Sequence, residues 1–199
     1  IADSRIQTSF ILLNHSAAVA DVTLEPVKET GEPMTLGMAG GRKSVFSVKV
    51  PAGGAVELVS DGSTNPVVLG WAKASSTIPI GGCALFTTSM AAGGQFVSQV
   101  GVPDSPSSYR LSIFAQADET VNTGFGLTNP GSDPLVVTLR LIKRGLPGQF
   151  GTVLKTKTLD LPANSHTARF VTEFFSDVPE VQQLKFEGSI EAEVGSPQL

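Results

Sequence analysis

The stretch TSFILLN at Thr8–Asn14 has a counterpart, TGFGLTN, at Thr123–Asn129, 115 residues further along the chain. Both stretches carry Phe and Leu two positions apart, which is the spacing of residues on one face of a β-strand. Both also end in Asn, which closes turns because its side chain bonds nearby backbone and because it tolerates a left-handed φ. The pair therefore predicts one strand-and-turn unit that occurs twice.

Further matches follow the two stretches in the same order. Val22–Leu24 recurs as Val137–Leu139 at the same spacing of 115 residues, and Val48–Ala52 recurs as Leu159–Ala163 at a spacing of 111. Self-similarity at a nearly fixed period is the signature of a repeated structural unit. We interpret it as an internal duplication.

Short apolar runs rich in Val, Ile, Phe and Thr recur along the chain between Gly, Pro, Asn and Ser, and they predict strands. Many short strands with regular turn signals are typical of a sandwich. We expect an all-β protein of two tandem Ig-like antiparallel β-sandwich domains, residues 1–104 and 105–199, joined near Gly101–Ser108. One helical turn is expected at Val171–Phe175, with Phe174 and Phe175 either capping the second sandwich or forming an apolar patch for a partner.

Each copy lacks a strand that the other has. The Cys83–Thr87 strand has no counterpart in the second copy, and the leading strand Tyr109–Phe114 has only the short, polar Ile1–Gln7 in the first. A sandwich without one strand leaves a sheet edge and part of its core open. Three explanations remain: the chain is cut from a longer tandem array, Ile1–Ile6 fills the gap, or a neighbouring subunit donates the strand.

Composition narrows the class of partner. The 199 residues are 16% charged, with a formal net charge of −4 and a pI of about 5.2. We expect no nucleic acid or anionic lipid partner, because the chain lacks a basic field. No membrane span is expected, because no apolar run reaches the ~18 residues that one needs.

The cysteine content and the first residue bear on the compartment. A single cysteine, Cys83, allows no intrachain disulfide. The weakly charged surface, rich in Ser, Thr and Gly, is typical of a secreted bacterial protein. A chain that begins at Ile1 without Met or signal peptide is expected to be a mature form or an excised piece.

The order of the motifs resembles a family pattern. Thr-x-Phe-x-Leu-x-Asn is followed by Val-Thr-Leu, by Leu-Pro-Ala and by Gly-x-x-x-Ala, the last at Gly70–Ala74 and Gly188–Ala192. This arrangement resembles tandem Ig-like β-sandwich modules of large secreted and surface-exposed bacterial proteins, and it covers nearly the whole chain. The resemblance implies a non-catalytic extracellular module of adhesion, surface-structure or glycan-related proteins. It carries over no site residue.

Signals for catalysis are weak. The two histidines, His15 and His166, lie next to predicted turns, and Cys83 lies in a predicted strand where a small buried side chain is the usual role. Neither a Gly-x-Ser-x-Gly nucleophile turn nor a phosphate-binding glycine loop occurs. We therefore expect no enzyme and no cofactor.

Two aromatic residues and three acidic residues are candidate binding groups. Trp71 and Tyr109 are the single Trp and the single Tyr, and each would suit a stacking platform for a sugar. For Trp71, which lies in an apolar run flanked by small residues, the interpretation as a core residue packed between the sheets is favoured over a platform. Calcium, which prefers oxygen ligands, is the metal that the chain would suit best, and Asp118, Glu119 and Asp133 are its weak candidates.

Together these patterns predict a non-catalytic structural or adhesive protein, extracellular or at the cell surface. It would bind itself, or neighbouring modules of a longer surface protein, through β-strand edges or end-to-end contacts. A filament subunit completed by donor strands is one form of this hypothesis, with Ile1, Ile6 and Leu199 as its assembly residues. The alternative is a carbohydrate-binding module of a secreted bacterial protein, supported by calcium, with polysaccharide as the partner.

Overall fold

A computed structural model describes residues 4–63, 66–90 and 92–195. The chain is 58% strand and 4% helix in several antiparallel sheets, so the all-β prediction is confirmed. Its backbone divides into two compact units, the first unit at Ile1–Pro106 and the second unit at Ser107–Leu199. Among the described residues, no helix is long and apolar enough to cross a membrane.

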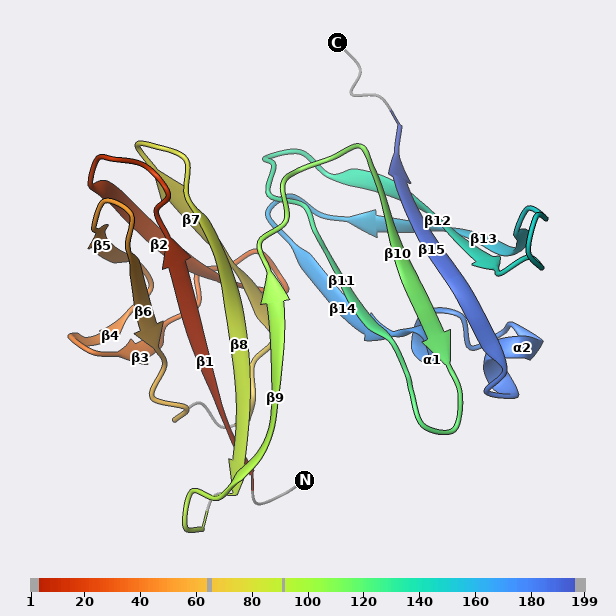
Figure 1. Ribbon diagram of the computed structural model, residues 1–199, viewed down its shortest axis with the longest axis horizontal. Coiled ribbons are helices and arrows are strands. Elements are labelled where there is room, and N and C mark those ends of the chain that lie inside the picture. Colours follow the sequence, from red (N-terminus) through yellow and green to blue (C-terminus); the bar gives the residue numbers. More distant parts are fainter. Residues whose placement is uncertain (1–3, 64–65, 91, 196–199) are drawn as a thin grey trace. The chain divides into compact units, whose positions relative to one another are not determined.

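The first unit contains two facing sheets (Figure 1). One has the strand order β6-β1-β8-β9 and the other the order β5-β2-β7, while β3 and β4 form a separate hairpin. The strands are β1 (Ser4–Leu13), β2 (Ala20–Lys28), β3 (Leu36–Met38), β4 (Gly41–Lys43), β5 (Phe46–Val50), β6 (Ala55–Val59), β7 (Gly70–Ser76), β8 (Gly81–Met90) and β9 (Phe96–Pro103). Residues Gly101–Pro103, which the sequence assigns to the spacer, instead continue β9 and pair with Cys83–Leu85.

The core of the first unit lies between these two sheets. Leu12 of β1 is buried against Val22 of β2 and Val50 of β5, and the half-buried Val56 and Leu58 of β6 pack on this cluster. Along β2 and β5 the buried apolar residues alternate with polar, more exposed ones, so each of these strands turns one face inward.

The second unit also contains two sheets, with the strand orders β10-β15-β12-β13 and β11-β14. Two short helices separate β14 from β15. The elements are β10 (Arg110–Ala117), β11 (Gly124–Thr128), β12 (Leu135–Lys143), β13 (Thr152–Leu161), β14 (His166–Phe170), α1 (Val171–Phe174), α2 (Pro179–Gln182) and β15 (Phe186–Val194). The helical turn expected at Val171–Phe175 is confirmed as α1, whereas α2 was not predicted.

Phe174, the last residue of α1, and Phe175, which follows it, belong to the core of the second unit. Phe175 is fully buried among residues of β12 and β15, and Phe174 stacks on Phe125 of β11 with ring centroids 4.4 Å apart. They therefore cap this core, as one of the two interpretations predicts, and they do not form an exposed patch.

The two units share the same strand register wherever they share strands. Ser9 of β1 pairs with Val59 of β6. Gly124 of β11, 115 residues after Ser9, pairs in the same way with Phe170 of β14, 111 residues after Val59. The same two spacings relate the whole β2–β5 ladder to the β12–β13 ladder. The β2–β7 ladder corresponds in the same way to the β12–β15 ladder, with β7 and β15 separated by 118 residues.

A buried asparagine ties the two sheets of the first unit together. Asn14, 1% exposed, follows β1 and donates from Nδ2 to three carbonyl oxygens, those of Ala18 at 2.7 Å and of Val50 and Pro51 at 3.1 Å each. Its Oδ1 accepts the backbone N–H of Ser16 at 3.0 Å. One side chain thus closes the turn after β1 and also holds the end of β5 in the facing sheet.

The second unit repeats this arrangement. Asn129, also 1% exposed, donates from Nδ2 to the carbonyl oxygens of Asp133, Leu161 and Pro162 at 2.8, 3.2 and 3.0 Å. Its Oδ1 accepts the N–H of Gly131 at 3.0 Å. The turn-closing role that the sequence predicts for both asparagines is confirmed, and the link between the sheets is added by the fold.

A glycine in the same register position lets two strands approach closely in each unit. A Cβ atom at Gly70 of β7 would overlap the carbonyl oxygen of Val27, and one at Gly188 of β15 would overlap that of Ile142. Val27 and Ile142 are themselves 115 residues apart. The glycine of the Gly-x-x-x-Ala motif is therefore required by backbone contact.

The strands predicted to be missing are also missing from the ladders of the described residues. β8 pairs with β1, but β11, which matches β1, pairs with β14 alone; β10 pairs with β15, but β7, which matches β15, pairs with β2 alone. Among the described strands, the β5-β2-β7 sheet of the first unit is therefore one strand shorter than its counterpart in the second unit. The β11-β14 sheet of the second unit is two strands shorter than its counterpart in the first.

The asparagine link predicts a large stability effect. Asn14→Ala leaves carbonyl oxygens of a buried turn without a donor, and we expect the free energy of unfolding of the first unit to fall by about 2–4 kcal/mol. Trp71, the single tryptophan, reports this unit in urea titrations followed by fluorescence. As a control, Gln99→Ala removes one exposed hydrogen bond to Thr87 and should cost less than about 0.5 kcal/mol. An Asn14→Ala midpoint equal to that of the wild type would contradict the assigned role.

Candidate functional site

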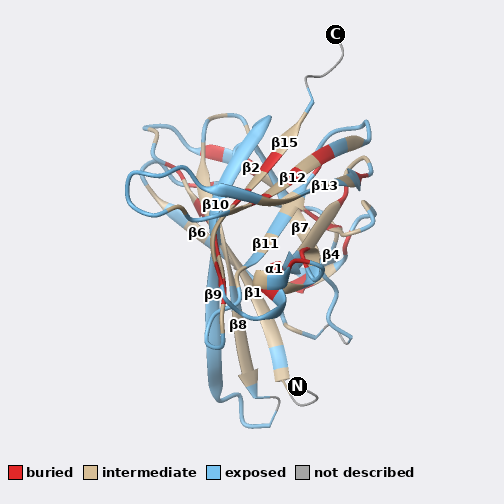
Figure 2. Cartoon of the chain, turned by 90° about the vertical axis from the view of Figure 1, so that its right-hand side faces the viewer, coloured by how far each residue is buried: buried red, intermediate tan, exposed pale blue. Residues whose placement is uncertain are grey.

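The inner face of the four-stranded sheet in the first unit extends beyond what the facing sheet covers. Phe10 packs into the core, Ala84 of β8 lies directly opposite it, and Val102 of β9 lies opposite Ala84. Directly opposed residues share a face of the sheet, so Val102 points toward the interior side. Val102 is nevertheless 48% exposed, and Val100, two residues earlier on the same face of β9, is 59% exposed. All residues of β9 are exposed (Figure 2).

In the second unit the inner face of β10 is also left partly uncovered. Leu111 and Ile113 of β10 lie opposite Ala192 and Ile190 of β15, which are buried, so these four residues share the inner face. Leu111 and Ile113 are still 37% and 38% exposed. The facing sheet here has only β11 and β14 among the described residues, which explains why β10 is uncovered.

Two strands also present unpaired backbone edges within the described part of the chain. Leu69 and Thr77, which flank β7, direct their backbone groups to β2 and the residue that follows it, so the even-numbered residues Ala72 and Ala74 of β7 direct theirs to the open side. Asn129, which follows β11, directs its N–H to Ser165 beside β14, so the backbone groups of Gly124 and Gly126 in β11 face the open side. Unpaired edges are the usual template for adding a strand from another chain.

Val100 and Val102 were not predicted from the sequence to be functional residues. The alternation Ser98-x-Val100-x-Val102 was a strand signal in the sequence. The two prolines that follow favoured the interpretation of this segment as a spacer.

Trp71 does not lie between the sheets, which corrects the core interpretation. It is half-buried, and its neighbour Ala72 packs against the core, so Trp71 points to the outer face of the β5-β2-β7 sheet, opposite Val27. The same outer face carries a cross-strand row of hydroxyl side chains, Ser47, Thr23 and Ser75, beside a shallow cavity of about 520 Å³.

The other predicted binding residues do not meet at one place. Tyr109, 64% exposed, precedes β10 in the second unit. Ile6 lies in β1 and pairs with Thr88 of β8, so the Ser4–Ile6 part of the N-terminal segment does not occupy the open edge of β7. Ile1 and Leu199 lie outside the described residues.

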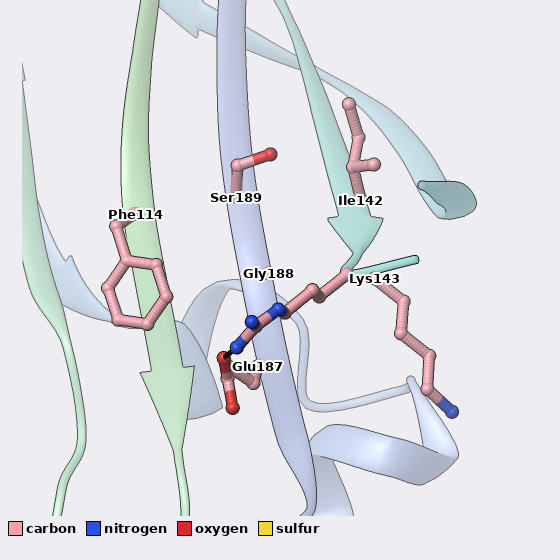
Figure 3. Close-up of a pocket in the computed structure, with 7 residues that line it drawn as sticks. Phe114, Ile142, Lys143, Glu187, Gly188 and Ser189 are labelled. Atoms are coloured by element: carbon pink, nitrogen blue, oxygen red, sulfur yellow. Dashed lines mark hydrogen bonds and ion pairs between the residues drawn. The ribbon is translucent and has the colours of Figure 1, made fainter. Parts of the chain in front are cut away.

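A second shallow pocket, of about 340 Å³, lies on the outer face of the second unit (Figure 3). Phe114 of β10 and Ile142 of β12 line it on either side of β15. The charged side chains around it form ion pairs, Arg144 with Glu187 and Lys143 with Glu180. The described lining contains one hydroxyl group, Ser189, and neither a histidine nor a cysteine to activate it.

The calcium candidates are engaged in turns. Oδ1 of Asp118 accepts the N–H of Thr120, its hydroxyl and the N–H of Val121 at 2.7–2.8 Å, and Oδ2 accepts the side-chain amide of Gln116. These bonds, led by that from the Thr120 N–H, lower the pKa of Asp118 to about 2. Within the described ranges, no three His, Cys, Asp or Glu side chains gather as a metal site.

The remaining candidate residues are distributed over both units. Glu119 is exposed beside Asp118, and the backbone oxygen of Asp133 is bonded by Asn129. Cys83 is half-buried in β8, His15 is exposed after β1, and His166 begins β14. His15 and Cys83 belong to the first unit and His166 to the second.

Comparison of the chain with protein-family models, with curated proteins and with solved structures finds no match.

The depressed pKa of Asp118 predicts a pH dependence of stability. A carboxylate whose pKa is lowered by folding stabilises the protein fully above its unfolded pKa, near 3.8, and loses that contribution as the pH falls toward about 2. Asp118→Asn removes this ionisation but keeps an acceptor oxygen. The stability difference between wild type and variant in thermal unfolding should therefore shrink between about pH 5 and pH 2. A difference that stays constant over this range would contradict the assignment.

Proposed function

We propose that the chain is a non-catalytic structural or adhesive protein of the cell surface or extracellular space, built from Ig-like β modules that associate through their strands. The observation that carries the proposal is that part of the hydrophobic core in each unit is uncovered. Each unit combines an unpaired sheet edge with apolar side chains that face inward and remain exposed. Such surfaces mark sites where another protein segment binds.

An internal duplication is part of this proposal, and the matched registers support it. The two units agree in their shared ladders, in their buried asparagines and in the glycines at which strands approach closely. Because the strands lacking in one unit are present in the other, each unit supplies a template for completing the other. Modules of one kind would then associate with each other or with themselves.

The chemistry of the described surface favours assembly over catalysis. The two pockets described above are shallow and are lined by paired charges, hydroxyl groups and apolar side chains. The acidic net charge of −4 supports partners other than nucleic acid. We therefore propose no cofactor for this function.

Assembly is tested by light scattering and electron microscopy of the untagged full chain over a range of concentrations. We expect oligomers or filaments. Val102→Lys places a charge on the uncovered inner face and should abolish them, because burying an unpaired charge is costly. Gln99→Lys is the matched control, since Gln99 is also exposed but pairs with Thr87 and alternates to the face of β9 opposite Val100 and Val102, and this variant should assemble normally. A chain that stays monomeric throughout would overturn the proposal.

A carbohydrate-binding function is the second candidate, and the outer face of the β5-β2-β7 sheet supports it. Trp71 shares that face with Lys73 and with the hydroxyl row that ends at Ser75. Sugar sites combine an aromatic surface with nearby polar groups in this way.

Affinity electrophoresis against a panel of polysaccharides tests the second candidate. Trp71→Ala should remove any retardation of the chain while the circular dichroism spectrum stays that of the wild type. Phe114→Ala, an exposed aromatic of the second unit, is the control and should be retarded as the wild type is. Equal mobility of wild type and Trp71→Ala on every polysaccharide would exclude this function for Trp71.

A further inference from the structure

The open edge of β7 and the uncovered residues of β9 belong to a single slot in the first unit. The three-stranded sheet β5-β2-β7 faces the four-stranded sheet β6-β1-β8-β9, so a further strand beside β7 would extend the shorter sheet. The inward side chains left exposed are Phe86 of β8 with Val100 and Val102 of β9. One wall of the slot therefore offers backbone hydrogen bonds and another offers apolar surface.

The second unit identifies the strand that fits such an edge. β15 corresponds to β7 at a spacing of 118 residues, and its second edge is occupied by β10 in antiparallel pairing. The effect of that strand on burial is direct. Ala192 of β15, which β10 flanks, is 8% exposed, whereas its counterpart Ala74 of β7, which no described strand flanks on that side, is exposed.

The side chains of β10 have the pattern that the slot requires. Leu111, Ile113, Ala115 and Ala117 alternate along its inner face, and the last two are fully buried. Leu111 and Ile113 are the ones left partly exposed in the second unit, where no strand equivalent to β8 or β9 is described. A strand with these residues beside β7 would place its branched side chains toward Val100 and Val102.

We propose that the slot beside β7 binds an antiparallel strand of the β10 type, contributed by another module of the same kind. Its inward residues follow the pattern of Leu111, Ile113 and Ala115. Transferred by 118 residues, the β10–β15 register places the Leu111 equivalent opposite Ala74 and the Ile113 equivalent opposite Ala72. This inference rests on the proposed function, because it assigns the strand and the register through which modules associate.

The experiment uses the full chain and a synthetic peptide of residues 109–118, with amide hydrogen exchange followed by nuclear magnetic resonance. At concentrations low enough to keep the full chain monomeric, the amides of Ala72 and Ala74 face the open side and should exchange rapidly. Saturating peptide should slow them by about tenfold or more. The amides of Trp71 and Lys73, which face β2, are internal controls and should change little.

Two modified peptides test the direction of the hydrogen bonds. The odd-numbered residues of β10 direct their backbone groups to β15, as the bond from the Val194 N–H to the Tyr109 carbonyl indicates. Methylation of the Ile113 amide nitrogen should therefore abolish binding, whereas methylation at Phe114, whose N–H points away, should leave it intact. The two peptides have the same composition and charge.

The outcomes separate this inference from the proposed function. Binding without protection of Ala72 and Ala74 overturns the inference, as does protection of Gly124 and Gly126 at the edge of β11 instead. An absence of binding by a chain that still forms oligomers overturns the inference and leaves the proposed function standing. An absence of both binding and assembly overturns the two together.

Discussion

The structure of each unit depends on one buried amide side chain. Asn14 and Asn129 each donate to three carbonyl oxygens, one in the following turn and two at the end of a strand in the facing sheet. Carbonyl oxygens at a buried strand end must find a donor. An asparagine satisfies them and fixes the distance between the sheets at that end, because its donor and acceptor belong to one short, rigid group.

The strand register follows from this fixed point. The asparagine holds together the ends of β1 and β5 in the first unit, and those of β11 and β13 in the second. The apolar residues at alternate positions of these strands then face the core. Gly70 and Gly188 then mark where the next strand passes over a carbonyl group. The frame is the same in both units, while the strands added to it differ, and the open edges and exposed inward side chains result from that difference.

The outer faces of the two frames carry different chemistry. The sheet of the first unit presents a row of hydroxyl groups with Trp71 near its edge. The sheet of the second presents ion pairs, Arg140 with Glu193 at 2.5 Å and Arg110 with Glu191 at 2.9 Å, and the Arg140 guanidinium lowers the pKa of Glu193. Outward residues do not take part in the core, so they are free to differ between units that fold alike.

The sequence by itself determined the strand class, the turn at each asparagine and the helical turn at Val171–Phe174, because alternation, spacing and turn chemistry are local. It also indicated that each copy lacks a strand. Only the tertiary structure decided that Trp71 points outward, that Gly101–Pro103 continue β9 and that Val100 and Val102 lie on an uncovered inner face. The face of a residue depends on register, and its exposure depends on the opposite sheet, and neither can be inferred from neighbouring residues alone.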